Sequence, residues 1–155
     1  MSATSLKPSL ADLPPLYLLL AILFMWLLHR WLPIVDLVGA PLSRLGWLFI
    51  VSGVAIAFWG RGRFVKAGAN VLPFSVSAAL VTDGPFRFTR NPMYLGMMLV
   101  LFGGGVLAGS LGSFLVLPVF FWWIRRRFVL REEDHMAAQF GEAYQAYKER
   151  VRRWL

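Results

Sequence analysis

The sequence predicts an all-α integral membrane protein, with about four transmembrane helices in two hairpins and a C-terminal amphipathic cytoplasmic helix. The first observation is composition: 58% of the 155 residues are hydrophobic, 15% are charged, and the mean hydropathy is +0.62. A soluble domain carries roughly 25% charged residues. The second is that uncharged residues form long runs, and the third is that basic residues gather between alternate runs. We therefore treat residues 1–155 as one membrane domain.

The first predicted hairpin comprises transmembrane segments at 13–33 and 45–60. Each contains a run of 16 uncharged residues, Leu13–Leu28 and Leu45–Gly60. These runs are somewhat shorter than the roughly 20 residues that a membrane-spanning helix needs, but flanking arginines can reach the interface and the bilayer can thin locally. The first run has neither a strongly basic leader nor a small-residue cleavage site, so we interpret it as a span and not as a signal peptide.

The second predicted hairpin lies in the longest uncharged stretch, the 34 residues from Asn91 to Ile124. This stretch is too long for one helix and suits two short ones, at 92–109 and 111–127. Glycine and serine dominate Gly109–Ser113, a composition typical of a tight turn. We therefore place the break between the two helices there.

The distribution of basic residues predicts the orientation. The N-terminus, the central loop at 61–91 and the C-terminal tail together hold 14 of the 16 basic residues, whereas the other side holds only Arg30 and Arg44. Cytoplasmic loops carry the excess of lysine and arginine. Both termini and the central loop are therefore expected in the cytoplasm. The net charge of +8 then suits anionic lipid headgroups as partners, and not nucleic acid.

The tail at 128–155 is predicted to form an amphipathic helix. Its apolar residues Phe140, Tyr144, Tyr147 and Val151 recur at spacings of 4, 3 and 4. This periodicity places them on one helical face, which can lie on the membrane or cap the bundle.

Metal and thiol chemistry are not expected. The chain has no cysteine, which excludes disulfides, thiol nucleophiles and cysteine-ligated metals. It has only two histidines, His29 and His135, so a histidine-based metal site is not predicted either. His135 follows three acids on the predicted tail helix, and we interpret it as an exposed helical histidine.

The densest group of polar and aromatic residues is the segment Leu80–Gly96, which leads directly into the third span. Pro92 suits the first turn of a helix, and Asn91 is a natural N-cap residue. Free N–H groups at such a helix start, together with the Arg90 guanidinium, would bind an anionic group such as a carboxylate. Tyr94 follows one turn later, on a position that can face the same cavity.

A structural interpretation of the same segment remains open. Arg87 and Arg90 can be interfacial arginines, Asn91–Pro92 only a helix start, and Tyr94 an aromatic residue of the interfacial belt. Gly96 admits the close approach of either a ligand or a neighbouring helix.

A second candidate site is the acidic run Glu132–Asp134, just after the last span. An ammonium group or ribose hydroxyls would be suitable partners for these carboxylates. The alternative is a solvated helix start in which the acids pair with the preceding arginines, 125–131, since charge runs usually form solvated faces.

Two motifs resemble one superfamily. Leu80–Gly96 reads LVTxGPFRFxRNPMYLG, and Glu132–Glu133 is followed by FGExYxxY over Phe140–Tyr147 and by the ending RVRRWL. In this order, and separated by a short helical hairpin, they resemble the signature of the isoprenylcysteine carboxyl methyltransferase and phospholipid methyltransferase superfamily. The resemblance covers about half of the chain, from Leu80 to the C-terminus. It implies an integral helical enzyme without a Rossmann domain, here expected in the inner membrane of a bacterium.

The resemblance also implies a cofactor, S-adenosyl-L-methionine, in a pocket that faces the cytoplasm. The residues at the matching positions are Leu80, Val81, Phe86, Arg90, Asn91, Pro92, Met93, Tyr94, Gly96, Glu132 and Glu133. Asn91 departs from the eukaryotic isoprenylcysteine enzymes, which have histidine there, so this side chain cannot act as a base. A lipophilic acceptor would come from the bilayer, with Arg127 or Arg131 near its carboxylate or headgroup.

Three residues are assigned catalytic roles as hypotheses. Arg90 and the helix start would hold the cofactor's carboxylate, Glu132 its ammonium or ribose, and Tyr94 would line the methyl-transfer site. The expected function is methyl transfer to an isoprenylcysteine-like carboxylate or another lipid. Two alternatives remain: a phospholipid N-methyltransferase, and a small membrane protein that acts as a partner without catalysis.

Overall fold

The computed structural model describes residues 12–68 and 79–155, and every element of regular secondary structure in these ranges is helical apart from one isolated bridge. The elements are α1 Pro14–Trp31, η2 Leu42–Leu45, α2 Gly46–Lys66, η3 Gly84–Arg87, α3 Pro92–Ala108, α4 Leu111–Phe114, α5 Val116–Ile124, η4 Arg125–Val129 and α6 Leu130–Arg150. Two helical stretches are long and apolar enough to cross a membrane, α1 and Leu42–Lys66, and α3 is a shorter apolar helix. The predicted all-α class is confirmed.

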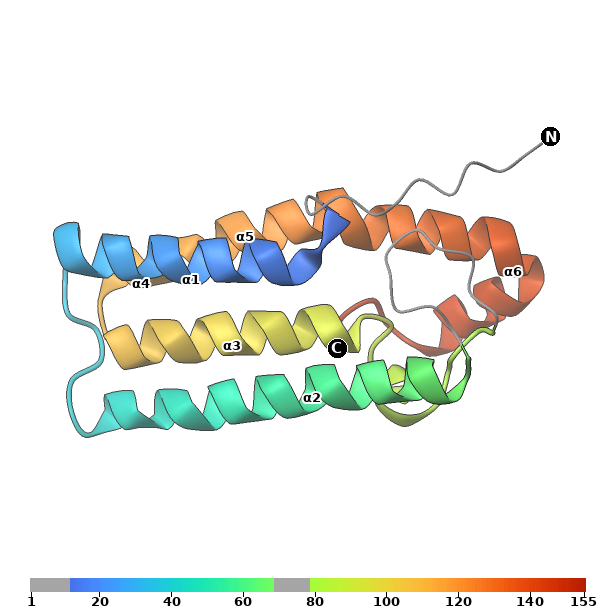
Figure 1. The fold of residues 1–155 in the computed structure, drawn as a ribbon, viewed down its shortest axis with the longest axis horizontal. Helices are drawn as coiled ribbons and strands as arrows, with labels where there is room; N and C mark the ends of the chain where they lie inside the picture. The colour runs from blue at the N-terminus through green and yellow to red at the C-terminus, as the bar shows by residue number, and fades with distance from the viewer. Residues whose placement is uncertain (1–11, 69–78) are drawn as a thin grey trace.

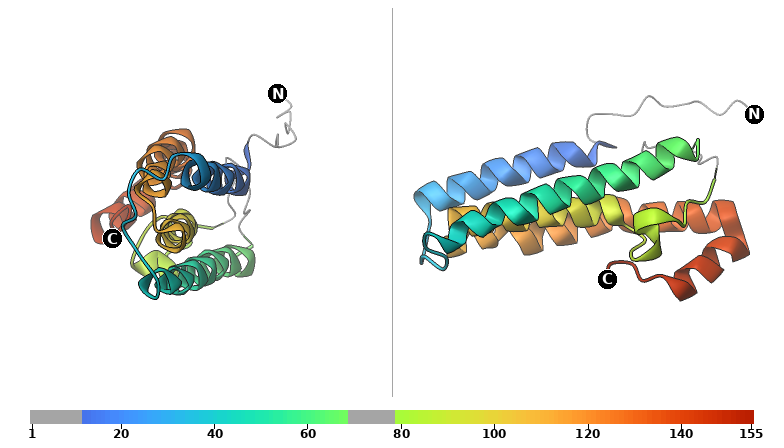
Figure 2. Two further views of the ribbon diagram at one scale, coloured as in Figure 1. Left: turned by 90° about the vertical axis from the view of Figure 1, so that its left-hand side faces the viewer. Right: turned by 90° about the horizontal axis from the view of Figure 1, so that it is seen from below.

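The helices form an elongated bundle in which α3 lies between α2 on one side and α1 with α5 on the other (Figures 1 and 2). The main core lies where α3 meets α5 and η4, and its fully buried side chains include Leu101, Ile124, Phe128 and Val129. Helix α6 extends past the end of α1 and α3, and the C-terminus returns to lie beside the start of α3 (Figure 1). We call this end of the bundle the α6 end.

The C-terminal half differs from the expected single helix over 128–155. Helix α5 continues without a break through the π-helical turn η4 into α6, so the last apolar helix and the tail form one long rod. The rod then turns sharply at Gly141, where φ is 51° and ψ is −124°. Glycine tolerates this backbone conformation, which other residues rarely adopt. The turn directs the last helical segment, up to Arg150, back toward the bundle.

Helices α2 and α3 pack backbone against backbone through two pairs of glycines. A Cβ atom at Gly53 would lie 2.5 Å from the carbonyl oxygen of Gly96, and one at Gly96 would collide with the carbonyl oxygen of Gly53. Gly46 and Gly103 meet in the same reciprocal way. The two contacts are seven residues apart on both helices, which is two turns. Small residues at this spacing let the two helices approach closely, as is usual for helices packed in a membrane.

Hydrogen bonds close the end of the bundle opposite α6. The loop after α1 pairs with the turn before α4, where Leu37 and Val38 donate backbone N–H groups to the carbonyl of Gly109. The fully buried Ser110 lies 3.0 Å from Nδ1 of His29 and 2.9 Å from the hydroxyl of Ser113. The start of α4 is thereby fixed to the end of α1.

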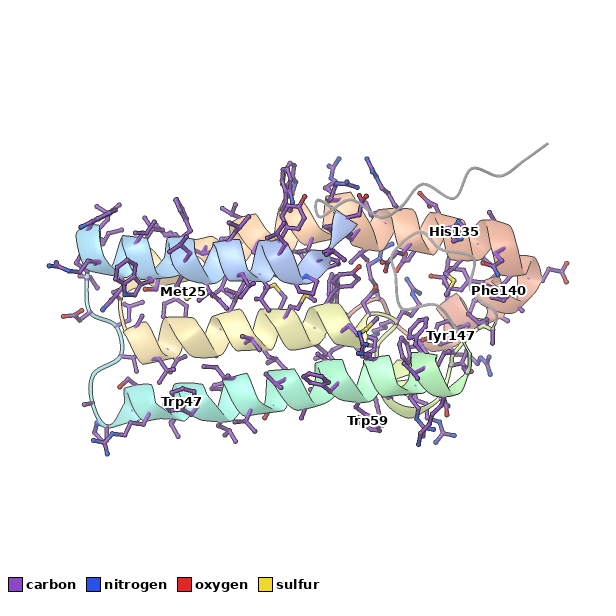
Figure 3. All side chains as sticks on the ribbon, in the orientation of Figure 1. Met25, Trp47, Trp59, His135, Phe140 and Tyr147 are labelled. Carbon is purple, nitrogen blue, oxygen red and sulfur yellow. The ribbon has the colours of Figure 1, made fainter. Side chains whose placement is uncertain are left out.

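A second, smaller core lies at the α6 end. Val81 and Phe86, from the segment before α3, pack with Tyr144 and Tyr147 after the turn of α6. The Tyr147 hydroxyl donates a 2.7 Å hydrogen bond to the backbone carbonyl of Phe86. Figure 3 shows Phe140 at the outer turn of α6 and Tyr147 on the segment that follows this turn. This core holds the Leu80–Gly96 segment against the last part of α6.

Candidate functional site

A pocket of about 640 Å³ lies between α1, α2 and α3, at the α6 end of the bundle. This volume is in the range of small-molecule sites, roughly 300–1,000 Å³. Its walls are mostly apolar and comprise Leu13, Pro14, Pro15, Leu18, Gly53, Val54, Ala57, Phe58, Met93, Gly96, Met97 and Val100. Helices α1 and α2 both pack on α3 but do not pair closely with each other, as the end view of Figure 2 shows. The pocket therefore opens sideways between them.

Side chains of α2 show where this opening lies. Val54 and Phe58 line the pocket and are nevertheless 42% and 68% exposed. They lie four residues apart on one face of α2, beside the glycine contact. An apolar molecule could thus enter from the side of the bundle without first crossing its α6 end.

Three polar side chains line the pocket at its α6 end. Arg61 comes from α2, Tyr94 from the first turn of α3 and Glu132 from the first turn of α6. The Tyr94 hydroxyl donates a 2.7 Å hydrogen bond to Oε1 of Glu132. The pocket is therefore amphipathic, with an apolar body and a polar end.

The protonation of Glu132 is shifted by its surroundings. Burial raises the pKa of this carboxyl to about 7, and the hydrogen bond from Tyr94 opposes the rise only in part. The residue as a whole is only half-buried, and it lines the pocket. A carboxyl with a pKa near neutrality can both accept and release a proton under ordinary conditions.

The adjacent residue Glu133 has the opposite environment. It lies away from the pocket, accepts hydrogen bonds of 3.0 and 2.8 Å from Arg153, and pairs with Arg90 at 3.1 Å. Burial by itself would raise the pKa of Glu133, but the two arginines outweigh it and hold the pKa below its ordinary value. Glu133 is therefore a charged anchor for the C-terminal segment.

Arg90 also binds the C-terminal segment. One terminal nitrogen of its guanidinium donates to the carbonyls of Lys148 and Val151 at 3.2 and 3.0 Å, and the other donates to Glu133. Its side chain is only 9% exposed, and Nε is buried without a partner in the described part of the chain. In this structure the guanidinium fixes the tail against the start of α3, and it does not reach the pocket between α1 and α2.

Asn91 occupies the predicted N-cap position but does not cap α3. The helix begins at Pro92 as expected, yet Asn91 makes no side-chain capping bond. Its side-chain amide instead donates to the carbonyl of Arg153 at 3.1 Å, which also accepts a bond from the Thr89 hydroxyl. The predicted capping role was wrong, because the side chain of Asn91 binds instead to the carbonyl of Arg153, which lies 62 residues later in the sequence.

His135 is one turn beyond Glu132 on α6. Its Nε2 atom is buried and has no hydrogen-bond partner among the described residues. Figure 3 shows His135 on the part of α6 that extends past the other helices. A buried ring nitrogen without a partner is a site at which a ligand can supply the missing hydrogen bond. The sequence predicts an exposed histidine here, and the buried Nε2 differs from that prediction.

The predicted site residues fall into three groups. Met93, Tyr94, Gly96 and Glu132 line the pocket. Leu80, Val81, Phe86, Arg90, Asn91, Pro92 and Glu133 do not line it and instead build its support at the α6 end. Of the predicted substrate arginines, Arg127 pairs with Asp12 at 2.9 Å and Arg131 is exposed on α6.

Arg61 lines the pocket but was not predicted as a site residue, and neither were most of the apolar wall residues. It was counted only as one of the basic residues that predict the orientation. A signal was present, because Val54, Ala57, Phe58 and Arg61 follow the spacing of one helical face, and they all line the pocket. Nothing in the sequence indicated that this face of α2 borders a cavity.

Comparison with known proteins gives three results. The family model described as phospholipid methyltransferase matches residues 42–143. The protein-S-isoprenylcysteine O-methyltransferase of Schizosaccharomyces pombe is 31% identical over 130 residues, covering 76% of this chain and 55% of that protein. An uncharacterized protein of Haemophilus influenzae is 35% identical over 63 residues, covering 41% of this chain and 100% of that protein.

The chain thus spans only about half the length of the Schizosaccharomyces pombe relative. No solved structure matches. The matched range, 42–143, contains α2, α3 and the first turns of α6, and so it includes every polar residue at the end of the pocket.

Proposed function

The chain belongs to the phospholipid methyltransferase family, whose members are membrane methyltransferases, and on this premise we propose that it methylates a lipophilic acceptor with S-adenosylmethionine as methyl donor. The acceptor would enter the pocket from the bilayer, between α1 and α2. Its reacting group would lie at the α6 end, which the distribution of basic residues places in the cytoplasm. The chain would accordingly cross the bacterial inner membrane several times, with both termini in the cytoplasm.

The observation that carries this proposal is the amphipathic pocket itself. Its body is apolar and open at the side, which suits a hydrocarbon chain, and its polar end holds Tyr94 and Glu132. A partner protein without catalysis would have no need for a half-buried carboxyl whose pKa is about 7 at the end of an apolar cavity. Strongly shifted acids in clefts are typical of catalytic and binding sites.

Residues at the polar end fit the chemical groups of S-adenosylmethionine. Among the side chains of residues 12–68 and 79–155, Tyr94 alone donates a hydrogen bond to Glu132, and the remaining acceptor sites of this carboxyl can bind an ammonium or ribose hydroxyls. The buried Nε2 of His135, one turn away, can take a hydrogen bond from a polar ligand group. Arg90, in contrast, would have to release the carbonyls of Lys148 and Val151 before it could bind a carboxylate.

When bound, S-adenosylmethionine supplies an electrophilic methyl group, and the chain's own residues contribute position and proton control. The apolar walls exclude water and orient the acceptor, and such positioning accounts for as much as ~7–11 kcal/mol of barrier lowering. A carboxylate acceptor arrives ionised and needs no base. An amine acceptor must lose a proton, and Glu132, with the Tyr94 hydroxyl beside it, is placed to accept it.

Methylation of a phospholipid amine is therefore the second candidate function, and the near-neutral pKa of Glu132 favours it. The two candidates differ in their pH dependence. Methyl transfer to an amine should decline as the pH falls and Glu132 becomes protonated. At saturating S-adenosylmethionine, where weaker cofactor binding by protonated Glu132 no longer limits the rate, transfer to a carboxylate should not show this acidic limb near neutrality.

Calorimetric titration of the detergent-purified protein with S-adenosylhomocysteine tests the cofactor site. The wild type should bind at micromolar concentrations, and Glu132→Gln should weaken binding at least about tenfold, which is about 1.4 kcal/mol. Glu142→Gln, an exposed position on the same helix, is the matched control and should bind as the wild type does. If the folded wild type does not bind at all, the methyltransferase proposal is wrong.

A further inference from the structure

The polar end of the pocket contains one charged group to which the proposed chemistry gives no role, the guanidinium of Arg61. It comes from α2, whereas the tyrosine and the carboxylate come from α3 and α6. It is exposed, and it takes part in no ion pair within residues 12–68 and 79–155. The neighbouring Arg63, in contrast, pairs with Asp83 at 3.0 Å.

The position of Arg61 relative to the apolar wall is the second observation. Val54, Ala57, Phe58 and Arg61 lie on one face of α2 at helical spacing, and all four line the pocket. From Gly53 to Arg61 the helix rises about 12 Å. A chain that lies along this wall would therefore place its polar end beside Arg61.

Resting on the proposed function, we propose that Arg61 binds an anionic group of the acceptor and thereby selects amphiphiles that carry one, a carboxylate or a phosphate, next to the apolar chain. A guanidinium is permanently charged and forms paired hydrogen bonds with either of these planar or tetrahedral oxyanions. At the border of an apolar cavity its attraction for an anion is stronger than it would be in water. An acceptor whose only charge is a cation would be repelled.

Arg61 differs in this respect from the arginines that sequence analysis assigned to the substrate. Arg127 already pairs with Asp12, and Arg131 lies outside the pocket. Arg61 is thus the arginine that the pocket offers to an incoming headgroup. The competing explanation is that Arg61 merely reaches the phosphates of the surrounding bilayer, as interfacial arginines do. In that case it would not discriminate between ligands of the pocket.

A binding assay without methyl donor separates the two explanations. The probes are dansylamino-undecanoic acid, its uncharged methyl ester and the corresponding dansylaminoundecyl phosphate, each titrated into protein in a neutral maltoside detergent at fixed ionic strength. The wild type should bind one or both anionic probes at least about tenfold more tightly than the ester, which is about 1.4 kcal/mol. Preference for the acid indicates a carboxylate acceptor, and preference for the phosphate indicates a phospholipid headgroup.

The variants decide whether Arg61 is responsible. Arg61→Gln should lose the preference while it binds the ester as the wild type does, which also shows that the pocket is intact. Arg61→Lys should keep part of the preference, because the charge remains but the planar fork is lost. Lys66→Gln, an exposed residue on the same helix outside the pocket, is the matched control and should keep the full preference.

The inference is overturned if Arg61→Gln retains the preference, or if Lys66→Gln reduces it equally, which would indicate general surface attraction. If Arg61→Gln does not fold, two other measurements decide: the preference of Arg61→Lys for the anionic probes, and the effect of salt on the preference of the wild type. The inference is overturned if the preference changes neither with the lysine substitution nor with salt. Binding that depends on Arg61 without any methyl transfer would contradict the proposed function alone. Methyl transfer with binding indifferent to Arg61 would contradict this inference alone.

Discussion

Helix α3 meets its two neighbours in opposite ways. On the α2 side, Gly53 and Gly96 bring the two backbones into direct contact, and no side chain fits between them. On the α1 side, the helices stand far enough apart to leave a pocket of about 640 Å³. The same helix therefore contributes one face to a closely packed pair and the other face to a cavity.

The difference shows how a small membrane protein can keep a cavity without losing its fold. Lipid tails are as apolar as leucine side chains, so helices in a bilayer associate through close packing and not through hydrophobicity. The α2–α3 pair supplies this close packing, whereas α1 is held by Ala21 and Met25 in the main core and, near its ends, by the Arg127–Asp12 ion pair and the contact between His29 and Ser110. Between these ends the side of the bundle remains open.

The largest expected effect comes from breaking the α2–α3 contact. Gly96→Leu would force side-chain atoms into the backbone of α2 and should destabilise the protein by more than about 3 kcal/mol, since overpacking of this severity exceeds the usual range. Thermal unfolding in detergent measures the change. Gly62→Leu on α2 is the control, because nothing lies within 4 Å of a Cβ atom there, and it should change stability little. Equal stability of the two variants would contradict the packing described here.

The next largest effect is expected at the support of the pocket, on α6. Glu133→Gln leaves Arg90 and Arg153 without their carboxylate, and removing one partner from a buried ion pair costs roughly 3 kcal/mol. Because the pKa of Glu133 is lowered in the folded state, its stabilisation is present above the ordinary value of 4.5 and is lost as the pH falls through the lowered pKa. Melting curves of the wild type and the variant should therefore converge at acidic pH. The exposed Glu149→Gln should show neither effect.

Filling the pocket should affect activity more than stability. Val54→Trp places a large side chain in the lateral opening, where the native residue is 42% exposed, and should lower methyl transfer at least about tenfold, equivalent to about 1.4 kcal/mol. The melting temperature should fall less than in Gly96→Leu, because Val54 is 42% exposed and is not among the atoms that meet at the Gly53–Gly96 contact. Val51→Trp, on the same helix but outside the pocket, should leave the rate unchanged. A similar loss of rate in both variants would exclude this route for the acceptor.

A pH dependence of stability is also expected from the pocket itself. Glu132 has a pKa of about 7 in the folded protein and about 4.5 when unfolded, so the folded state binds more protons between these values. Stability from this group should therefore fall as the pH rises from 4.5 to 7, opposite in sign to the contribution of Glu133. Glu132→Gln should flatten this part of the stability profile. A wild-type profile already flat in this range would contradict the raised pKa.

Local features of the chain made part of this structure predictable. Pro92 and the left-handed Gly109 delimit α3, and the helix observed, Pro92–Ala108, is close to the segment predicted at 92–109. The turn of α6 at Gly141 was not predicted, because a glycine within an otherwise regular helical pattern is usually tolerated. Only the packing of Tyr144 and Tyr147 on the segment before α3 requires the chain to reverse there.

Partners distant in the sequence were not predictable. Arg90 was expected to bind a ligand, yet it bonds to carbonyls 58 and 61 residues further along the chain. Arg127 was expected near the substrate and pairs with Asp12, 115 residues earlier. A charged side chain in a sequence shows which kind of group it can bind, but the group that reaches it depends on how the helices pack.

The sequence by itself determined the all-helical class and the approximate limits of the first and third helices, α1 and α3, because composition, periodicity and turn residues act locally. The tertiary structure decided which of two adjacent acids lines the pocket. Consecutive residues on an α-helix point about 100° apart. Glu132 therefore faces the cavity and Glu133 faces the two arginines only because of the rotation at which α6 packs on the start of α3.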